Sequence, residues 1–370
     1  MLAHALDDLL AVLRTDFTEQ QFNSAARHFM HAVPSAPRDE VHAAMRALAA
    51  TLDFRNAPQS TFAATIIGAL LEMGFDPATV EEPLVRELHE ALVLAARLAD
   101  ACNEAVSAHP ASEDTENGED GEEDDEDDDP FEVERERLAA LMPDEALAWD
   151  ALEVASYPGV VLFSVSAAAR ERAERLREPA TRLAPHHSPV EWLELILSVL
   201  HDEPVLVIEP STRRGIVGRI SGVVDNFQFQ TLLMDAFPRG LLSRPRVAPE
   251  AVAVARGEGR EEIDLYVPGA WNMYIWAAVT PRLELPEPGD FSMQGYWIWG
   301  EGRPEDIPVF EGHRVMLLDP QSYPRNWYAQ RAFEHLKAGL RVDAKLSKGE
   351  VEGWLTRMAR AAAELPRGVG

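Results

Sequence analysis

The residues best suited to catalysis stand next to predicted strands in the C-terminal part of the chain. His201 precedes a buried-strand pattern at 205–208, and Asp225 and Asn226 lie at a boundary between a strand and a helix. Arg325 follows the last predicted strand. Polar groups at the end of a sheet, with aromatic side chains nearby, are typical of a ligand pocket. An ordinary helix N-cap, however, explains Asp225 without any function.

These four residues are the candidate catalytic residues, and the enzyme that they favour is a hydrolase. The hypothesis requires that the four side chains and Trp271 converge in one concave pocket, with at least one acid or base of strongly shifted pKa. No motif adds support. The chain has no G-x-S-x-G nucleophile turn, and its single cysteine, Cys102, lies among small apolar residues within a predicted helix.

Aromatic side chains are concentrated in two short segments, WNMYIW and YWIWGEG. Alternation along a strand puts Tyr296 and Ile298 on one face of the second segment and Trp297 and Trp299 on the other. One face must pack a core, whereas the other is either covered by a helix or forms a recognition surface. The candidate binding residues are Trp271, Trp276, Tyr296, Trp297 and Trp299.

The region 303–325 carries charges of both signs around a predicted strand. Such side chains can bind an anionic ligand, but the pattern favours pairing with one another at the surface. They are Arg303, Asp306, Arg314, Asp319, Tyr323 and Arg325.

No motif indicates a cofactor. Gly215, Gly218 and Gly222 lie in RRGIVGRISG, which follows neither the dinucleotide-binding nor the P-loop pattern. Glycines inside a strand pattern more often mark a bulge or a turn. We therefore expect no nucleotide and no other cofactor.

No motif indicates a metal ion either. His28 and His31 are three residues apart and His186 and His187 are adjacent, but neither pair has the third ligand that a zinc site needs. The acidic run at 113–129 lacks the spaced oxygen ligands and turn glycine of a calcium loop. We expect no bound metal.

Charge limits the class of partner. The formal net charge is -29, with 63 acidic residues against 34 Lys and Arg, so the clustered basic residues that bind a phosphate backbone are missing. An acidic surface favours solubility and basic partners. The expected partner is therefore a protein, and a basic one, rather than a nucleic acid.

The location expected from the sequence is the cytoplasm. The N-terminus MLAHALDDLL has no basic region and reaches acidic residues within its first turns, unlike a signal peptide. A single cysteine excludes an intramolecular disulfide. We also expect no membrane span, and the richness in Ala, Arg and Glu suggests a bacterial source.

Helical periodicity and one charge run predict the domain organisation. Residues 1–110 show apolar spacings of three and four and predict a small α-helical bundle; helix pairs of this length also occur in solenoids, but no repeat recurs. In 113–129, 13 of 17 residues are Asp or Glu and none is apolar. Like charges at this density repel one another, so 111–130 is expected to be an extended acidic tether.

Residues 131–370 are expected to form an α+β domain with a mainly antiparallel sheet. Helices extend to about residue 200, although YPGVVLFSVS fits a buried strand or a helix equally well. Strands are predicted between about 204 and 320, with one helix at 227–237. The predicted strands are 205–208, 213–224, 263–267, 271–279, 295–299 and 313–318. Two closing helices are expected, one at 327–340 and one capped by Ser347.

The function class that these patterns favour is a non-enzymatic protein-interaction module, of the adaptor or immunity and inhibitor type. The lack of a catalytic motif in the sequence and the acidity of the chain support it. The first alternative is the hydrolase, with its pocket in the α+β domain. The second is a structural subunit of a larger assembly, which requires an exposed apolar patch of more than a few hundred Å².

Overall fold

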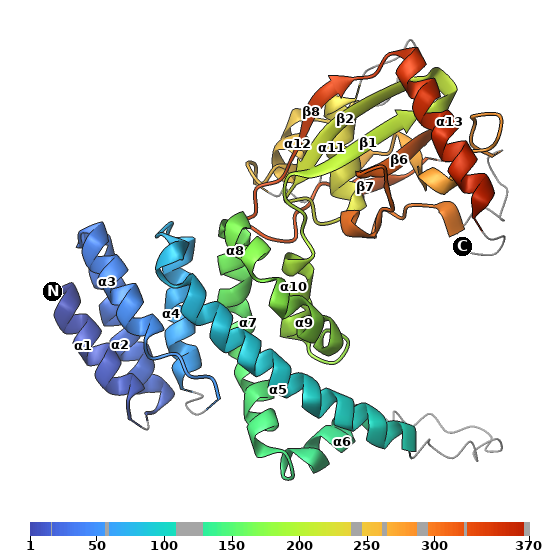
Figure 1. Cartoon of the computed structure of the whole chain (residues 1–370). Helices are drawn as coiled ribbons and strands as arrows, with labels where there is room; N and C mark the ends of the chain where they lie inside the picture. The colour runs from blue at the N-terminus through green and yellow to red at the C-terminus, as the bar shows by residue number, and fades with distance from the viewer. Residues whose placement is uncertain are drawn as a thin grey trace, which may run out of the picture. The chain divides into compact units, whose positions relative to one another are not determined.

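The computed structural model gives the fold of most of the chain in two parts (Figure 1). The residues it describes are 1–15, 17–55, 59–108, 129–237, 246–260, 265–286, 295–321 and 324–365. Contacts along the chain group these residues into two compact units, Met1–Leu197 and Ser198–Gly370. The expected tether lies outside the described residues up to Asp128, as does Tyr323.

The first unit is helical. Its helices are α1 (Leu2–Leu13), α2 (Glu19–Ala32), α3 (Arg38–Ala49), α4 (Ser60–Glu72), α5 (Glu81–Ala108), α6 (Pro130–Ala139), α7 (Pro143–Val165), α8 (Ala167–Arg172), α9 (Arg177–Leu183) and α10 (Ser188–Leu197). Local signals account for several ends. Thr18 and Gln21 form a capping box at the start of α2, and Gly74 follows α4 with φ of +82°.

The segment YPGVVLFSVS, which fitted either a strand or a helix, belongs to helix α7, and Pro158 lies inside this helix. Two glycines allow α7 to pack closely on its neighbours. A Cβ added at Gly68 of α4 would lie 3.2 Å from the Pro158 Cβ, and one at Gly159 would lie 2.8 Å from a methyl group of Leu88 on α5. The helices of 130–197 therefore pack with the N-terminal helices, whereas the sequence placed them with the sheet.

Among the described residues, α7 is the one helix that is long and apolar enough to cross a membrane. No such stretch was expected from the sequence. In the apolar window of α7, however, 61% of the residues are buried inside the protein. Such burial is typical of the core helix of a soluble protein.

The second unit contains a mixed sheet with the strand order β4-β6-β1-β2-β8 and β5 added beside β6. The strands are β1 (Glu203–Glu209), β2 (Arg214–Ser221), β4 (Trp271–Ile275), β5 (Val309–Phe310), β6 (His313–Pro320) and β8 (Gly339–Lys345), and β3 (Tyr266–Pro268) pairs separately with β7 (Asn326–Tyr328). Among the described strands only β1 and β6 are parallel, which agrees with an α+β fold.

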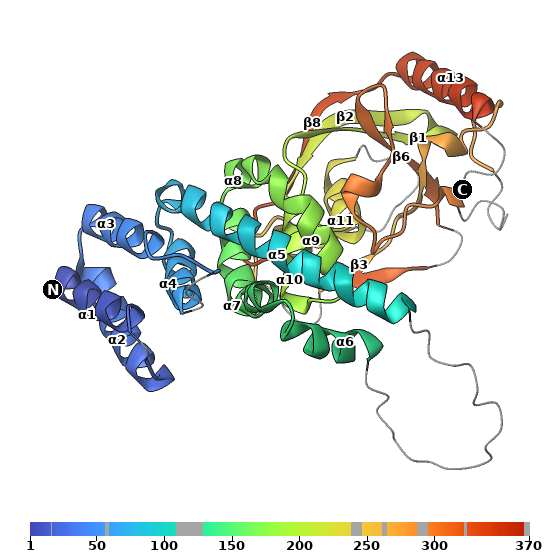
Figure 2. The ribbon, with the colours of Figure 1, turned by 60° about the horizontal axis from the view of Figure 1, so that its bottom comes forward.

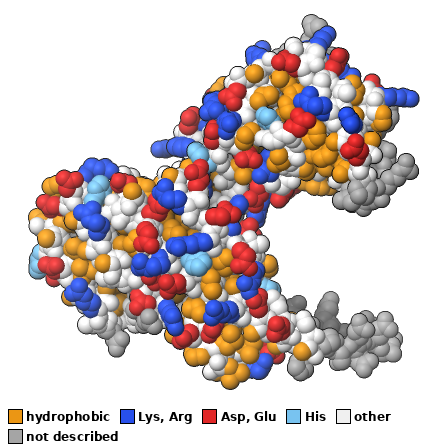
Figure 3. All heavy atoms as spheres, viewed as in Figure 1, with side chains coloured by type: hydrophobic (Ala, Val, Ile, Leu, Met, Phe, Trp, Pro, Cys, Tyr) orange, Lys and Arg blue, Asp and Glu red, His pale blue; other side chains and the backbone are white. Residues whose placement is uncertain are grey.

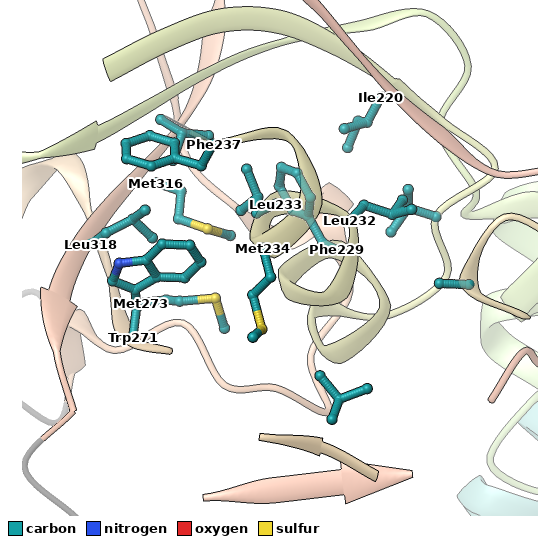
Figure 4. Close-up of a cluster of buried hydrophobic side chains, with 14 of the residues drawn as sticks. Ile220, Phe229, Leu232, Leu233, Met234, Phe237, Trp271, Met273, Met316 and Leu318 are labelled. Carbon is teal, nitrogen blue, oxygen red and sulfur yellow. The ribbon is translucent and has the colours of Figure 1, made fainter. Parts of the chain in front are cut away.

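Helices cover both faces of this sheet. Helix α13 (Lys348–Glu364) lies across one face, and α11 (Asn226–Ala236) and α12 (Pro249–Ala255) lie on the other (Figure 2). The side chains of β6 alternate accordingly. Met316 and Leu318 pack in the core of α11, whereas Val315 and Leu317 pack in the core of α13. Figure 4 shows the α11 core, with Phe229, Leu233, Trp271 and Met273 around Met316 and Leu318.

The helix expected at 327–340 was wrong. Trp327 lies on β7 opposite Val267, and Leu340 lies on β8 opposite Ile220. Pairing with strands far away in the sequence outweighs the local helical spacing, and Gly339 adds little helix propensity. The closing helix is correct, because Ser347 and Glu350 form the capping box of α13.

Two of the predicted strands are shorter than expected. Strand β4 ends at Ile275 and passes into a 3-10 turn at Trp276–Ala278. The segment 295–299 forms a single β-bridge, between Trp297 and Tyr274, rather than a strand. Residues 263 and 264 of the predicted strand at 263–267 lie outside the described ranges, and β3 begins at Tyr266.

Gly222→Ala is expected to destabilise the C-terminal unit by at least about 3 kcal/mol, because two costs add together. Gly222 has φ of +69°, and an added Cβ would lie 2.0 Å from the carbonyl oxygen of Lys337. Gly312→Ala is the matched control: its φ is +78°, but no atom lies within 4 Å of the added Cβ, so a loss of about 1 kcal/mol is expected. Urea unfolding followed by tryptophan fluorescence measures both, and equal losses would contradict the backbone clash at Gly222.

Candidate functional site

A cross-strand pair of polar residues marks the carboxyl ends of β1 and β6. Asn272 on β4 lies opposite Asp319 on β6. Residues paired in this way have Cβ atoms about 5 Å apart and share one face of the sheet. Because side chains alternate, this is the face that Tyr274 and Leu317 contribute to the α13 core.

The surroundings of the pair are largely buried. Asn272 is only 4% exposed, and its Oδ1 has no hydrogen-bond donor. The Tyr274 ring packs against the Trp297 ring in a T-shaped arrangement with 6.2 Å between centroids. The guanidinium of Arg325 lies over the Trp297 ring, 5.5 Å from its centroid. An amide thus lies opposite one carboxyl group, and a phenol, an indole and a guanidinium pack against one another on the neighbouring residues.

Asp319 has a pKa well above the ordinary value of an aspartate. Burial, together with the negative charge of Glu209, raises the pKa of Asp319 to about 6. Glu209 ends β1, is buried, and accepts a hydrogen bond from the Thr212 hydroxyl. In the part of the chain that the structure describes, no cationic side chain pairs with Asp319. Asp319 therefore changes charge near neutral pH.

Tyr274 responds to the same surroundings. Burial raises the pKa of the Tyr274 phenol, and the charge of Asp319 adds to this effect. The polar groups of Trp297 and Asn272 and the charge of Arg325 partly offset it. Tyr274 is consequently a neutral hydrogen-bonding group at physiological pH.

The N-terminus of α11 holds the segment that carries the exposed tryptophan. Asn226 Nδ2 donates to the carbonyl of Trp299 at 2.9 Å, and the Asn226 backbone N–H donates to Gly302 O at 3.0 Å. The Phe227 N–H donates to Gly300 O at 2.9 Å. At Gly300 an added Cβ would lie 2.2 Å from the Phe227 ring, so only glycine fits this close approach. The segment 299–302 is therefore fixed on α11.

Asp225 completes this arrangement as the N-cap of α11. Its carboxylate accepts the Gln228 N–H at 2.7 Å. Burial raises the pKa of Asp225, whereas the N–H groups of Gln228 and Phe227 oppose the rise. Because the first N–H groups of α11 already have protein acceptors, this helix end is not open to an anionic ligand.

The aromatic surface consists of Trp297, Trp299 and Arg325. Trp299 is 53% exposed, and its ring centroid lies 5.4 Å from that of Trp297. Trp297 and Arg325 are partly buried. On the face shown in Figure 3, apolar side chains of the C-terminal unit are gathered among charged ones.

The structure places the other predicted binding residues in packing roles. Trp271 is 3% exposed in the α11 core, with its ring edge against Phe237 (Figure 4). Trp276 packs on Phe310 with 5.0 Å between ring centroids, and Tyr296 packs beside the α13 core.

The five residues of the hydrolase hypothesis do not converge. His201 is exposed in the turn before β1, at the end of that strand opposite to Glu209. The seven residues of β1 separate the two ends by about 20 Å at 3.3 Å per residue. Asp225 caps α11 and Asn226 holds the segment 299–302. Of the five, only Arg325 lies beside the rings of Trp297 and Tyr274.

Asn272 and Tyr274 were not predicted as site residues from the sequence. Asp319 was expected to pair with a basic residue at the surface. A signal for Asn272 was present, because an amide between Trp271 and Met273 interrupts an otherwise apolar strand. Its opposite residue, however, follows only from the register of β4 on β6.

The histidines of the two pairs noted in the sequence contact other protein groups rather than a shared ligand set. The His186 ring stacks on Phe131 at 3.9 Å, and His187 is buried with Nε2 3.2 Å from the carbonyl oxygen of Trp149. His28 lies 3.8 Å from Asp8. Among the described residues, no group of three or more His, Cys, Asp or Glu side chains could hold a metal ion.

No family model, no curated protein and no solved structure matches this chain.

Asp319→Asn is expected to stabilise the C-terminal unit at pH 7.5. The folded-state pKa of about 6 lies above the ordinary value of 3.8, so the native state loses stability as pH rises through this interval and the carboxyl ionises. Because Asp319 is partly exposed, solvent screening limits the expected gain to roughly 1 kcal/mol, which is a few degrees in Tm.

The gain should nearly vanish at pH 4.0, where the folded carboxyl is protonated. The control is Asp343→Asn on β8, which removes a carboxylate 2.9 Å from Arg341 and should not stabilise the unit. Thermal unfolding at the two pH values measures both variants. A loss of stability at pH 7.5 in Asp319→Asn would contradict the raised pKa.

Proposed function

We propose that the chain is a cytoplasmic, non-enzymatic protein-interaction module, of the adaptor or inhibitor type, that binds a basic protein through the aromatic surface. The observation that carries this proposal is an exposed tryptophan on a fixed backbone. Trp299 exposes 53% of its surface, although three hydrogen bonds tie 299–302 to α11. Exposing so much indole to water is unfavourable unless a partner covers it.

Two physical arguments connect this surface with protein binding. Tryptophan and arginine are the side chains that most often dominate the binding energy of protein interfaces. A side chain that is already held in place loses little conformational entropy on binding, so more of the contact energy appears as affinity. Both arguments apply to Trp299, to Trp297 and to Arg325 stacked on it.

The choice of a basic partner rests on charge. The net charge of -29 gives the whole chain a negative potential that attracts basic proteins and speeds their association. Affinity should accordingly fall as salt is added.

Trp299→Ala is expected to weaken partner binding by at least about 30-fold, which corresponds to about 2 kcal/mol. The partner is first identified by placing a photo-cross-linking amino acid at position 299 in the native host, and its affinity is then measured with purified proteins. Trp192→Ala is the matched control, because Trp192 on α10 is 49% exposed and lies in the helical unit.

The control should bind with unchanged affinity, and both variants should keep the Tm of the unchanged protein within a few degrees. Equal affinities for Trp299→Ala and Trp192→Ala would overturn the proposed surface.

A hydrolase remains the second candidate because of Asp319. A carboxyl group whose pKa is about 6, beside the Tyr274 hydroxyl and the Asn272 amide, has the protonation behaviour of a general acid or base. This candidate requires turnover of a p-nitrophenyl ester, phosphate or glycoside that falls at least about 100-fold in Asp319→Asn. Its rate should change near pH 6, and turnover that is unchanged in the variant would exclude Asp319.

A further inference from the structure

The polar cluster beneath the aromatic surface contains buried polar atoms without a hydrogen-bond partner among the described residues, one of them a donor, Trp297 Nε1. The Oδ1 atom of Asn272 is buried without a donor, and Asp319 lies opposite it without a cationic partner among the described residues. Glu209 adds a second carboxylate close enough to influence Asp319. A buried acceptor without a donor destabilises the protein, so this cluster favours a ligand that donates hydrogen bonds.

The charges of the cluster favour a cationic donor over a neutral one. The negative charge of Glu209 from β1 acts on Asp319. Tyr274 from β4 lies within reach of the charges of both Asp319 and Arg325, the latter from the segment before β7. On this face α13 contributes apolar side chains, namely Val351, Leu355 and Met358. Asp319 is therefore the carboxylate on this face, whereas Glu209, which alternates with Ile208, lies toward the α11 face and contributes only its negative charge. The guanidinium of Arg325 lies over Trp297.

The neighbouring rings add to this preference. Tyr274 and Trp297 meet at 87° beside the acceptors, and the faces of such rings attract a desolvated ammonium or guanidinium. A hard divalent ion is less well suited, because calcium needs six to eight oxygen ligands and magnesium a near-octahedral set.

We propose that Asn272 and Asp319 form a subsite for the ammonium or guanidinium group of a basic side chain. The inference rests on the proposed function and makes it more specific: Trp299 contacts the apolar part of the partner, and a Lys or Arg of that partner enters beside Asn272. The Asn272 oxygen and the Asp319 carboxylate accept its N–H groups, and Tyr274 packs against the cation.

The test uses small probes on the full-length protein. N-acetyl-lysine amide and N-acetyl-arginine amide should change the tryptophan fluorescence with saturation in the millimolar range, which is typical of one weak contact. Nε-acetyl-lysine and citrulline derivatives of the same length are the neutral controls, and they should not bind. Binding of the neutral probes with equal affinity would overturn the subsite.

The pH dependence gives a second readout. Affinity should fall about tenfold between pH 7.5 and pH 5.0, because only about one tenth of Asp319 is ionised one unit below a pKa of about 6. Asp319→Asn should lose at least tenfold in affinity at pH 7.5 and should also lose the pH dependence. Asp343→Asn, on the opposite edge of the sheet, should retain both.

Further measurements separate this inference from the proposed function. Trp299→Ala should bind the probes normally and fail only with the protein partner. If no probe binds while Trp299→Ala still weakens the partner, the subsite is overturned and the aromatic surface stands. Saturable binding of Mg²⁺ or Ca²⁺ that Asp319→Asn abolishes, without binding of the probes, would also overturn it in favour of a metal site.

Discussion

The parallel pairing of β1 with β6 is the constraint on which the C-terminal unit depends. Parallel strands cannot be joined by a tight turn, so the chain must leave β1 and return to the same end of the sheet before β6 begins. The intervening chain includes β2, α11, α12, β3, β4 and β5. Because parallel strands end at the same edge, Glu209 and Asp319 lie at the same end of the sheet although more than a quarter of the chain separates them.

The two faces of the sheet have different roles, one in packing and one in the candidate site. On the α11 face, Trp271 and Met273 fill the core (Figure 4). On the α13 face, Asn272 and Tyr274 alternate with them along the same strand. A single short strand therefore supplies both the packing that holds the unit together and the polar groups of the candidate site.

Local signals in the sequence predicted much of the fold. The capping boxes at Thr18 and Ser347 are properties of four neighbouring residues, and they can be recognised without knowing the rest of the structure. The segment 327–340 could not be assigned in this way, because its hydrogen bonds go to β3 and β2. The candidate site depended on the same kind of information. Trp297 and Arg325 were identified by residue type, but the opposition of Asn272 and Asp319 follows from strand register alone.

The bridge between Trp297 and Tyr274 has an effect at the edge of the sheet. Strand β4 is an outer strand, and the Ile298 N–H donates to Met273 O at 2.9 Å along its free side. An outer strand with unpaired backbone groups can accept a strand from another molecule and start aggregation. The other outer strand, β8, carries Arg341, Asp343 and Lys345, whose charges oppose such pairing. The segment that displays Trp299 thus also pairs with the backbone of β4. A chain without this segment would lose its exposed tryptophan and would also expose an unpaired strand edge that can aggregate.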